Sequence, residues 1–254
     1  MNTYQPSVTI ITPCYNEQDI VIRFLLSLEQ ELISLPYRFT IVVVNDSSTD
    51  NTLELLKKFS FSSPDISLEV INLKFNAGHQ AAIYQGFLFA RSLPGHHYIV
   101  MDADGEDAPS VIPKLLALKE NDIVNVVRGQ RHESVLFRSC YFIYKALFRL
   151  ATGKQMNFGN FCLINRAVME RAIDTNFSHL AAFLSKQKCH RQYIVAAKQA
   201  RLGGASKMGF RKHMQHAVRS FDEYGMLLID FSSQDKRPQP IYELSSNDRS
   251  EKTI

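Results

Sequence analysis

Residues 8–32, VTIITPCYNEQDIVIRFLLSLEQEL, carry the pattern that decides the fold. Val8–Thr12 is a run of β-branched residues that stops at Pro13, and such a run predicts a short buried strand. From Glu17 to Leu32 the apolar residues return at helical spacing. A strand, a polar loop and a helix in this order form the first unit of an α/β fold.

The same alternation continues through the first half of the chain. Further strands are expected at Phe39–Val44, Leu68–Leu73, His97–Met101 and Asp122–Val127, and helices at Thr49–Phe59, Gly78–Ser92 and Ser110–Leu118. Strands that alternate with helices join through right-handed connections into a mostly parallel sheet flanked by helices. Ligands of such sheets bind beyond the carboxyl ends of the strands, so the site is expected there.

Beyond Arg128 the periodicity is weaker. We expect helices at Ser134–Ala151, at Arg166–Ile173 and from Lys212 to about Phe231, and strands at Phe161–Ile164 and Gln192–Ala197. These elements complete a single α/β domain over residues 1–231. Residues 232–254 are polar and include two prolines, which predicts a disordered tail.

The overall composition is that of a soluble globular protein, with 45% hydrophobic and 21% charged residues and a mean hydropathy of -0.14. No stretch approaches the ~18–20 apolar residues of a membrane span. Met1–Pro6 is polar, so no secretion signal is expected. The four cysteines, at positions 14, 140, 162 and 189, form no CxxC pair. We therefore expect free thiols in a cytoplasmic protein.

The positive charge is concentrated in the second half of the chain. Residues 134–221 contain fifteen Lys and Arg but only two acids, Glu170 and Asp174, a net charge of +13 against +4 for the whole chain. This asymmetry favours an anionic partner such as lipid head groups or phosphate, although a solvated basic face remains an alternative. No aromatic-basic motif supports nucleic-acid binding.

Polar clusters follow four successive predicted strands. They are Pro13-Cys14-Tyr15-Asn16-Glu17, Asn45–Asp50, Asn76–His79 and Asp102-Ala103-Asp104. Taken singly, residues such as Ser47, Thr49 and Asp50 are ordinary helix caps. Four clusters at neighbouring strand ends, however, are expected to converge on one crevice.

The cluster with the most chemistry is Asp102-Ala103-Asp104, which directly follows an apolar strand. Alternate residues of an extended segment point to the same side, and Glu106 repeats the spacing. Carboxylates in this arrangement suit a hard cation, Mg²⁺ or Mn²⁺, that would bridge a diphosphate. The three acids are therefore candidate metal ligands.

With these residues in view, the chain resembles family 2 glycosyltransferases of the GT-A fold, a Rossmann-like α/β architecture. It is most similar to dolichol-phosphate mannosyltransferases and bacterial polyprenyl-phosphate glycosyltransferases. The matching segments are Val8–Glu17, Val42–Thr52, Asn76–Gly86, Ile99–Pro109, Gly159–Arg166 and Arg201–Lys212. A nicotinamide-binding fold would need GxGxxG after the first strand, and the sequence has none there.

The resemblance implies a role for each cluster. The nucleotide base and ribose would lie among Pro13, Tyr15, Glu17 and Asp46, with Asn76 and Gly78 in the same donor site. Metal and diphosphate would be bound by Asp102, Asp104 and Glu106. The phosphates of donor or acceptor would be covered by Arg201, Ser206, Lys207 and Lys212. Among these, the residues with implied catalytic roles are Asp104, Arg201 and Lys207.

Four positions depart from the family pattern. The family usually has Asp where this chain has Asn45, Asn157 and Asn160, and Gln where it has Glu106. The family places a candidate catalytic base in the 157–160 region, and an amide cannot accept a proton as a base. A phosphate-monoester acceptor is already largely ionised at neutral pH, because its second pKa is about 6. Such an acceptor tolerates the loss of the base.

Three functions remain open. The first is metal-dependent, inverting transfer of a sugar from a UDP- or GDP-sugar to polyprenyl phosphate, for glycan or cell-surface polysaccharide synthesis. The second is transfer to a sugar hydroxyl of a surface polysaccharide or lipopolysaccharide. The third is nucleotide-sugar binding without catalysis.

Residues 134–151, SVLFRSCYFIYKALFRLA, combine three basic residues with many apolar ones and no acid. This composition is typical of a helix that lies in the membrane interface, and the alternative is a helix packed in the core. In the resembling family a similar helix sits at the membrane, and spanning helices follow the domain. We therefore expect a stand-alone catalytic domain that is at most peripheral on the inner face of the membrane.

Overall fold

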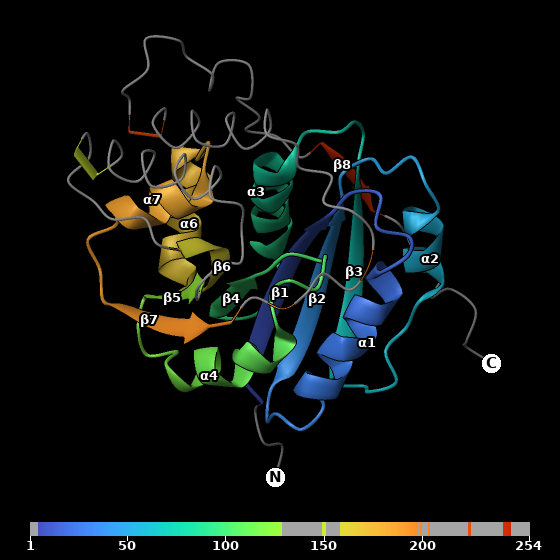
Figure 1. The fold of residues 1–254 in the computed structure, drawn as a ribbon, viewed down its shortest axis with the longest axis horizontal. Coiled ribbons are helices and arrows are strands. Elements are labelled where there is room, and N and C mark those ends of the chain that lie inside the picture. The colour runs from blue at the N-terminus through green and yellow to red at the C-terminus, as the bar shows by residue number, and fades with distance from the viewer. Residues whose placement is uncertain are drawn as a thin grey trace, which may run out of the picture.

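The protein forms an eight-stranded sheet with helices on both faces (Figure 1). The structure is a computed structural model that describes residues 5–128, 149–150, 158–197, 199, 203, 223–224 and 241–244. The strands are β1 (Ser7–Cys14), β2 (Arg38–Asn45), β3 (Ile66–Leu73), β4 (His97–Val100), β5 (Ile123–Arg128), β6 (Phe158–Asn165), β7 (Arg191–Ala196) and β8 (Tyr242–Leu244). The helices are α1 (Val21–Leu32), α2 (Thr52–Lys58), α3 (His79–Ala90), the 3-10 turn η1 (Pro109–Val111), α4 (Ile112–Ala117), α6 (Arg166–Thr175) and α7 (Leu180–Lys186).

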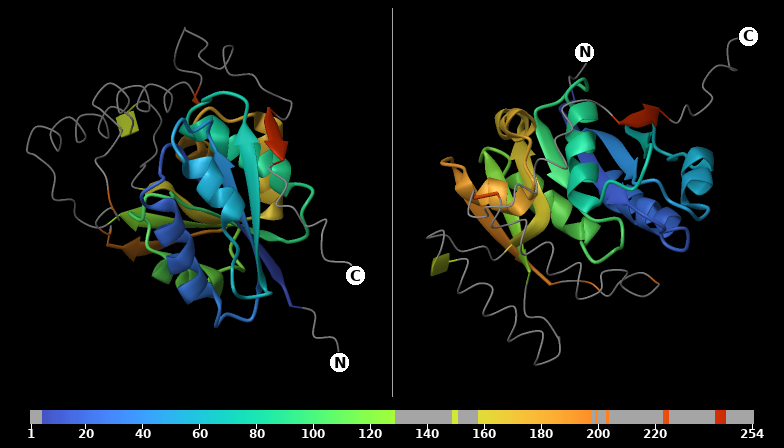
Figure 2. Two further views of the ribbon diagram at one scale, coloured as in Figure 1. Left: turned by 90° about the vertical axis from the view of Figure 1, so that its right-hand side faces the viewer. Right: turned by 90° about the horizontal axis from the view of Figure 1, so that it is seen from above.

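The strands lie in the order β7-β5-β6-β4-β1-β2-β3-β8. The pairs β1–β2, β1–β4, β2–β3 and β5–β7 are parallel. β6 runs antiparallel to both β4 and β5, and β8 runs antiparallel to β3. Figure 2 shows β7 (orange) and β8 (red) at opposite ends of the sheet. The mostly parallel sheet flanked by helices is confirmed.

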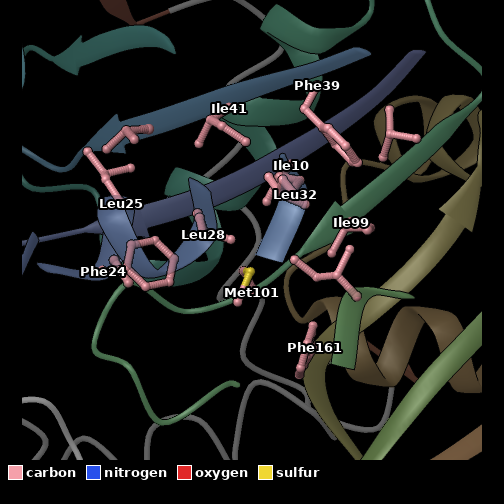
Figure 3. Packing of buried hydrophobic residues seen from close by; sticks show 14 of the residues in the cluster. Ile10, Phe24, Leu25, Leu28, Leu32, Phe39, Ile41, Ile99, Met101 and Phe161 are labelled. Carbon is pink, nitrogen blue, oxygen red and sulfur yellow. The ribbon is translucent and has the colours of Figure 1, made fainter. Parts of the chain in front are cut away.

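Two hydrophobic clusters form the core, one on each face of the sheet. Ile10 and Val43 belong to the cluster on the face of α1 and α4, whereas the adjacent Ile11 and Val42 belong to the cluster on the face of α3, α6 and α7. Both sides of the central strands are covered, which explains their continuous runs of apolar residues. Figure 3 shows the labelled side chains of α1, including Phe24, gathered against β1, β2 and β4.

Helix α3 packs unusually close to the sheet at Gly86. A Cβ atom built on this glycine would lie 2.4 Å from Ile11 Cγ2 and 3.1 Å from Val44 Cγ2. The close approach of helix and strand therefore requires a residue without a side chain. It also sets the position of the α3 N-terminus, where His79 and Gln80 lie.

The C-terminal prediction needs a correction. Residues 242–244 form β8, which pairs antiparallel with β3, whereas the sequence analysis predicted a disordered tail over 232–254. The outer edge of β3 carries backbone groups that need partners, and a short extended segment satisfies them regardless of its polarity. In addition, the Ile241 N–H donates to the buried Gln85 Oε1 at 3.1 Å.

Other predicted elements differ mainly at their ends. The first helix begins at Val21 rather than Glu17, and α7 was not predicted. Two further helices were predicted, at 134–151 and 212–231. The structure describes only Arg149–Leu150 of the first range and Glu223–Tyr224 of the second, and the remaining residues of both lie outside the described part. Within the described part of the chain, no helix is long and apolar enough to cross a membrane.

Candidate active site

The strand order creates a switch point beside β1. From β1 the chain proceeds through β2 to β3 in one direction, but β4 lies on the other side of β1. At such a point the connections leave in opposite directions and open a crevice at the carboxyl ends of the two strands. Pro13 is buried at this end of β1, paired with Val44. Tyr15 and Glu17 follow it, each partly exposed.

The loop after β1 is bonded to the loop after β2. Asn16, in a left-handed conformation with φ 55, accepts the Thr49 N–H on its Oδ1 at 2.7 Å. The Asn16 N–H donates to Ser48 Oγ and the Glu17 N–H to Thr52 Oγ1, each at 2.9 Å. These bonds explain the hydroxyl-rich sequence after β2, because each hydroxyl satisfies a backbone N–H group that the loop leaves unpaired.

Asp46 connects the end of β2 to the start of α3. Its side chain is buried, and its two oxygens accept the N–H groups of Ala77 at 2.6 Å and Gly78 at 2.9 Å. Asn76 Nδ2 donates to the Asp46 carbonyl at 3.2 Å. Gly78 has φ 87, a conformation that favours glycine, and is the N-cap of α3. The structure thus brings together three predicted donor-site residues, and Asp46 also holds the loop.

Asn45 occupies a position where the family usually has Asp, and its contacts explain the amide. Its Nδ2 donates to Asn72 Oδ1 at 2.6 Å, and its Oδ1 accepts the Ser48 hydroxyl at 2.5 Å. The side chain is fully buried. An ionised carboxylate can only accept, so it could not make both bonds in this arrangement.

The acidic segment after β4 has the alternation that its sequence predicts. Asp102, Asp104 and Glu106 are partly exposed, whereas Ala103 and Gly105 between them are buried. Asp104 Oδ1 accepts the Glu106 N–H at 2.9 Å across a turn in which Gly105 has φ 79. All three carboxylates therefore belong to partly exposed residues of one short segment.

Asp102 contacts His79, from the predicted Asn76–His79 cluster, and Asp107, which the sequence analysis did not include in the site. His79 Nε2 lies 3.4 Å from Asp102 Oδ1, which links the start of α3 to the end of β4. The buried Asp107 accepts the Asp102 N–H on its Oδ2 at 3.0 Å. Asp107 therefore fixes the main chain from which the first carboxylate projects.

His79 is in turn part of a chain of polar contacts. Its Nε2 lies 2.9 Å from Asn160 Nδ2, and Asn160 Oδ1 accepts from Gln80 Nε2 at 3.3 Å. Gln80, which is buried, accepts the N–H of Leu180 at the start of α7 at 2.7 Å. Asn160 therefore uses both ends of its amide within the protein. No sequence pattern could reveal these contacts, because Gln80 lies 80 residues from Asn160 and 100 from Leu180.

The acidic segment fits a divalent cation that takes part of its ligands from a substrate. Among the residues that the structure describes, no three His, Cys, Asp or Glu side chains lie close enough to hold an ion by themselves. Mg²⁺ usually binds to one or two carboxylates and completes its shell with phosphate oxygens and water. The carboxylates of Asp102 and Asp104, two residues apart and partly exposed, are a donor set of that kind.

Two described residues of the basic second half lie at the crevice. The Gln199 N–H donates to the Glu106 carbonyl at 3.1 Å. A Cβ on Gly203 would lie 3.2 Å from Ile20 Cγ2, in the loop before α1. The predicted phosphate-binding residues Arg201, Ser206, Lys207 and Lys212, together with Asn157, lie outside the described residues.

Comparison with known proteins identifies the family to which this sequence is similar. The model of glycosyl transferase family 2 matches residues 9–171. An undecaprenyl-phosphate 4-deoxy-4-formamido-L-arabinose transferase from Salmonella choleraesuis is 32% identical over 170 residues, which cover 66% of this chain and 50% of the relative. The chain thus spans about half the length of the curated relatives it matches.

Solved structures share the fold. A mannosyltransferase from Pyrobaculum calidifontis, determined with GDP-Man and Mn²⁺, has a TM-score of 0.58 at 20% identity over 87% of this chain and 65% of its own. A glucosyl-3-phosphoglycerate synthase from Mycobacterium tuberculosis, determined with Mg²⁺ and UDP, has a TM-score of 0.61 at 12% identity over 87% of this chain and 80% of its own. The architecture is that of GT-A glycosyltransferases, as the resemblance implied.

Proposed function

Because the chain belongs to glycosyl transferase family 2, we propose that it transfers a sugar from a nucleoside diphosphate-sugar to a polyprenyl phosphate. The observation that carries this proposal is the acidic segment at the switch point, where the partly exposed Asp102 and Asp104 follow β4, the neighbour of β1. The curated relatives in the comparison act on undecaprenyl phosphate by name. Two structural neighbours were determined with a nucleotide or nucleotide-sugar and a divalent cation.

In this proposal the donor lies across the carboxyl ends of β1, β2 and β4. Tyr15, Glu17 and the loop held by Asp46 surround the base and ribose, while Asp102 and Asp104 face the diphosphate. A bound Mg²⁺ or Mn²⁺ would neutralise charge on the departing diphosphate. We assign Arg201 to phosphate binding on the basis of the family resemblance.

The reaction is an inverting displacement at the anomeric carbon. An oxygen of the acceptor phosphate forms the new bond to that carbon, and the bond from the carbon to the diphosphate breaks. The nucleoside diphosphate leaves with the bonding electrons. No proton has to be removed from an ionised phosphate, whereas a sugar hydroxyl would need a base. Both amide atoms of Asn160 are occupied by His79 and Gln80, so this residue supplies no base.

Calorimetry tests the donor site. We expect wild-type protein to bind UDP or GDP more tightly with Mn²⁺ than without it, and Asp104→Ala to lose that dependence because a carboxylate ligand is removed. Asp174→Ala is the matched control, since this acid is exposed at the end of α6 and does not belong to the acidic segment. Unchanged Mn²⁺-dependent binding by Asp104→Ala would show that the acidic segment does not bind the donor complex.

The acceptor is tested with radiolabelled donor offered to a short polyprenyl phosphate and, separately, to hydroxyl-terminated glycans. We expect transfer to the lipid phosphate. Losing general-base help typically costs about 10²–10⁴ in rate for a hydroxyl nucleophile. Transfer to glycans alone would instead favour a polysaccharide or lipopolysaccharide transferase. Transfer to neither, with nucleotide-sugar binding retained, would favour a binding protein.

A lipid acceptor requires access to a membrane surface, and residues 134–151 are proposed to provide it. Their three basic side chains are each worth about 1 kcal/mol near an anionic surface, an attraction that salt screens. Flotation with anionic liposomes at low and high salt measures this binding. Replacing Phe142 and Phe148 by Glu should release the protein. Absence of anionic-lipid preference at low salt would assign this segment to the core.

A further inference from the structure

A series of hydrogen bonds leads from α7 through Gln80 and Asn160 to His79, and the donor and acceptor of each bond can be assigned. It begins at the main-chain N–H of Leu180, which can only donate, so the Gln80 atom 2.7 Å away is the amide oxygen. The NH₂ group of Gln80 then faces Asn160, whose nearest atom, at 3.3 Å, must be an oxygen. The remaining NH₂ group of Asn160 faces His79 Nε2 at 2.9 Å, so this ring nitrogen accepts.

This assignment determines the tautomer of His79. A neutral imidazole carries its proton on one ring nitrogen, and the other nitrogen has a single lone pair. A neutral ring whose Nε2 accepts from Asn160 carries its proton on Nδ1. Asp102 Oδ1 is 3.4 Å from the same Nε2, and in this tautomer no hydrogen atom lies between the two atoms. His79 therefore contacts Asp102 through Nε2 without donating a hydrogen bond to it from that nitrogen.

We propose that Gln80 and Asn160 are positioning residues that hold His79 in its Nδ1–H tautomer, and thereby keep a ring N–H from binding the Asp102 carboxylate. This inference rests on the proposed function, in which Asp102 contributes to binding the cation and diphosphate. An imidazole N–H aimed at Asp102 Oδ1 would compete with a cation for the same lone pairs. Partners of a metal-binding side chain typically change metal affinity about 10–100-fold when they are replaced.

The departure from the family pattern at position 160 gains a physical meaning from this arrangement. An aspartate there could accept from Gln80 but could not donate to His79. His79 would then donate to this aspartate from a protonated Nε2, and the same nitrogen also faces Asp102. The asparagine is therefore the residue that selects the tautomer in this chain.

Nitrogen-15 spectra of histidine-labelled full-length protein test the proposal directly, because protonated and unprotonated ring nitrogens give distinct signals. The signal of His79 is assigned by its loss in His79→Gln. The spectra are recorded over a range of pH, and the tautomer is determined from the spectra in which the ring is neutral. We expect the proton of wild-type His79 on Nδ1. Finding it on Nε2 would overturn the proposal.

Two variants should exchange the donor and acceptor at the hydrogen bond between position 160 and His79, each by a change at a different residue. Gln80→Glu accepts at both ends, so Asn160 must turn its NH₂ group toward position 80 and its oxygen toward His79. Asn160→Asp removes the donor itself. Both should move the proton of His79 to Nε2. Gln85→Glu is the matched control, since Gln85 is a buried glutamine of the same helix outside this series of hydrogen bonds, and it should leave the tautomer unchanged.

Calorimetry with Mn²⁺ and UDP or GDP then measures the consequence. Each reversing variant should weaken Mn²⁺-dependent nucleotide binding about 10–100-fold. If the variants acted only by adding negative charge, Mn²⁺ binding would become tighter. Weaker binding therefore indicates the change of tautomer, and tighter binding indicates the added charge. A moved proton with unchanged binding, or an unmoved proton in both folded variants, would overturn the positioning role. If wild-type protein shows no Mn²⁺-dependent nucleotide binding, the proposed function fails, while the spectra still decide the tautomer.

Discussion

Replacing Gly86 by Ala should destabilise the protein by forcing α3 away from the sheet. The added Cβ would lie 2.4 Å from Ile11 Cγ2 and 3.1 Å from Val44 Cγ2. Carbon atoms pack best at about 3.5–4.0 Å, so the helix or β1 must move by about 1 Å. Ile11 and Val44 are fully buried, and their β-branched side chains have little rotameric freedom to give way.

The expected net effect follows from two opposing terms. Overpacking a well-packed core typically costs about 1–3 kcal/mol. Alanine in place of glycine within a helix gains up to about 1 kcal/mol in helix propensity. We expect a net loss of about 1–2 kcal/mol, because the shortest contact is far below van der Waals distance. For a chain of this size that corresponds to a fall of about 2–8 °C in Tm.

A double-mutant cycle measured by urea unfolding isolates the steric term. Ile11→Ala removes Cγ2 and alone should cost about 2–5 kcal/mol. In that background Gly86→Ala should be neutral or stabilising, a coupling of about 0.5–3 kcal/mol. Ala81→Gly, at a partly exposed position of α3, measures the propensity term alone. Equal stabilisation by Gly86→Ala in both backgrounds would refute the steric reasoning.

Three further predictions concern stability. Arg166→Lys should cost about 1–3 kcal/mol in urea unfolding, because the guanidinium donates to the carbonyls of Gly95 at 3.0 Å and Leu93 at 2.8 Å, and an ammonium cannot reproduce this fork. Asp46→Asn should cost about 1–3 kcal/mol because an amide NH₂ would face a backbone N–H; an unchanged thermal midpoint would contradict this. Burial lowers the pKa of His97 below its usual 6.5, so the unfolded state binds the proton more readily and stability should fall as pH drops through about 6.5. His97→Gln should show a smaller loss of stability between about pH 7 and pH 5, and an identical loss would exclude His97 as a cause.

Local sequence patterns were sufficient for the first half of the fold. Apolar periodicity within each segment predicted β1 to β5 and the helices between them, with errors of a few residues at the ends. The alternation of Asp102, Asp104 and Glu106 was predicted from the period of an extended chain. The structure has alternating burial there, but in a turn at residues 103–105 rather than in an extended segment. These features depend only on neighbouring residues, so they were accessible without tertiary structure.

Short elements could not be predicted in this way. Helix α7, LAAFLSK, has seven residues, six of them buried, and so shows no polar face from which a helical period can be detected. Strand β8 has three residues and exists because β3 offers an unpaired edge. In both cases the packing partner, rather than the segment's own pattern, determines the conformation.

By itself, the sequence determined the α/β class, the family resemblance and the acidic segment that follows β4. Only the tertiary structure decided how the first of these acids and its neighbour His79 are held: Asp107 accepts the main-chain N–H of Asp102, and the backbone of α7 orients His79 through Gln80 and Asn160. Side-chain hydrogen bonds between residues far apart in the chain leave no periodic trace in the sequence. They form only after packing of the hydrophobic core has brought their backbones within a few ångströms of each other.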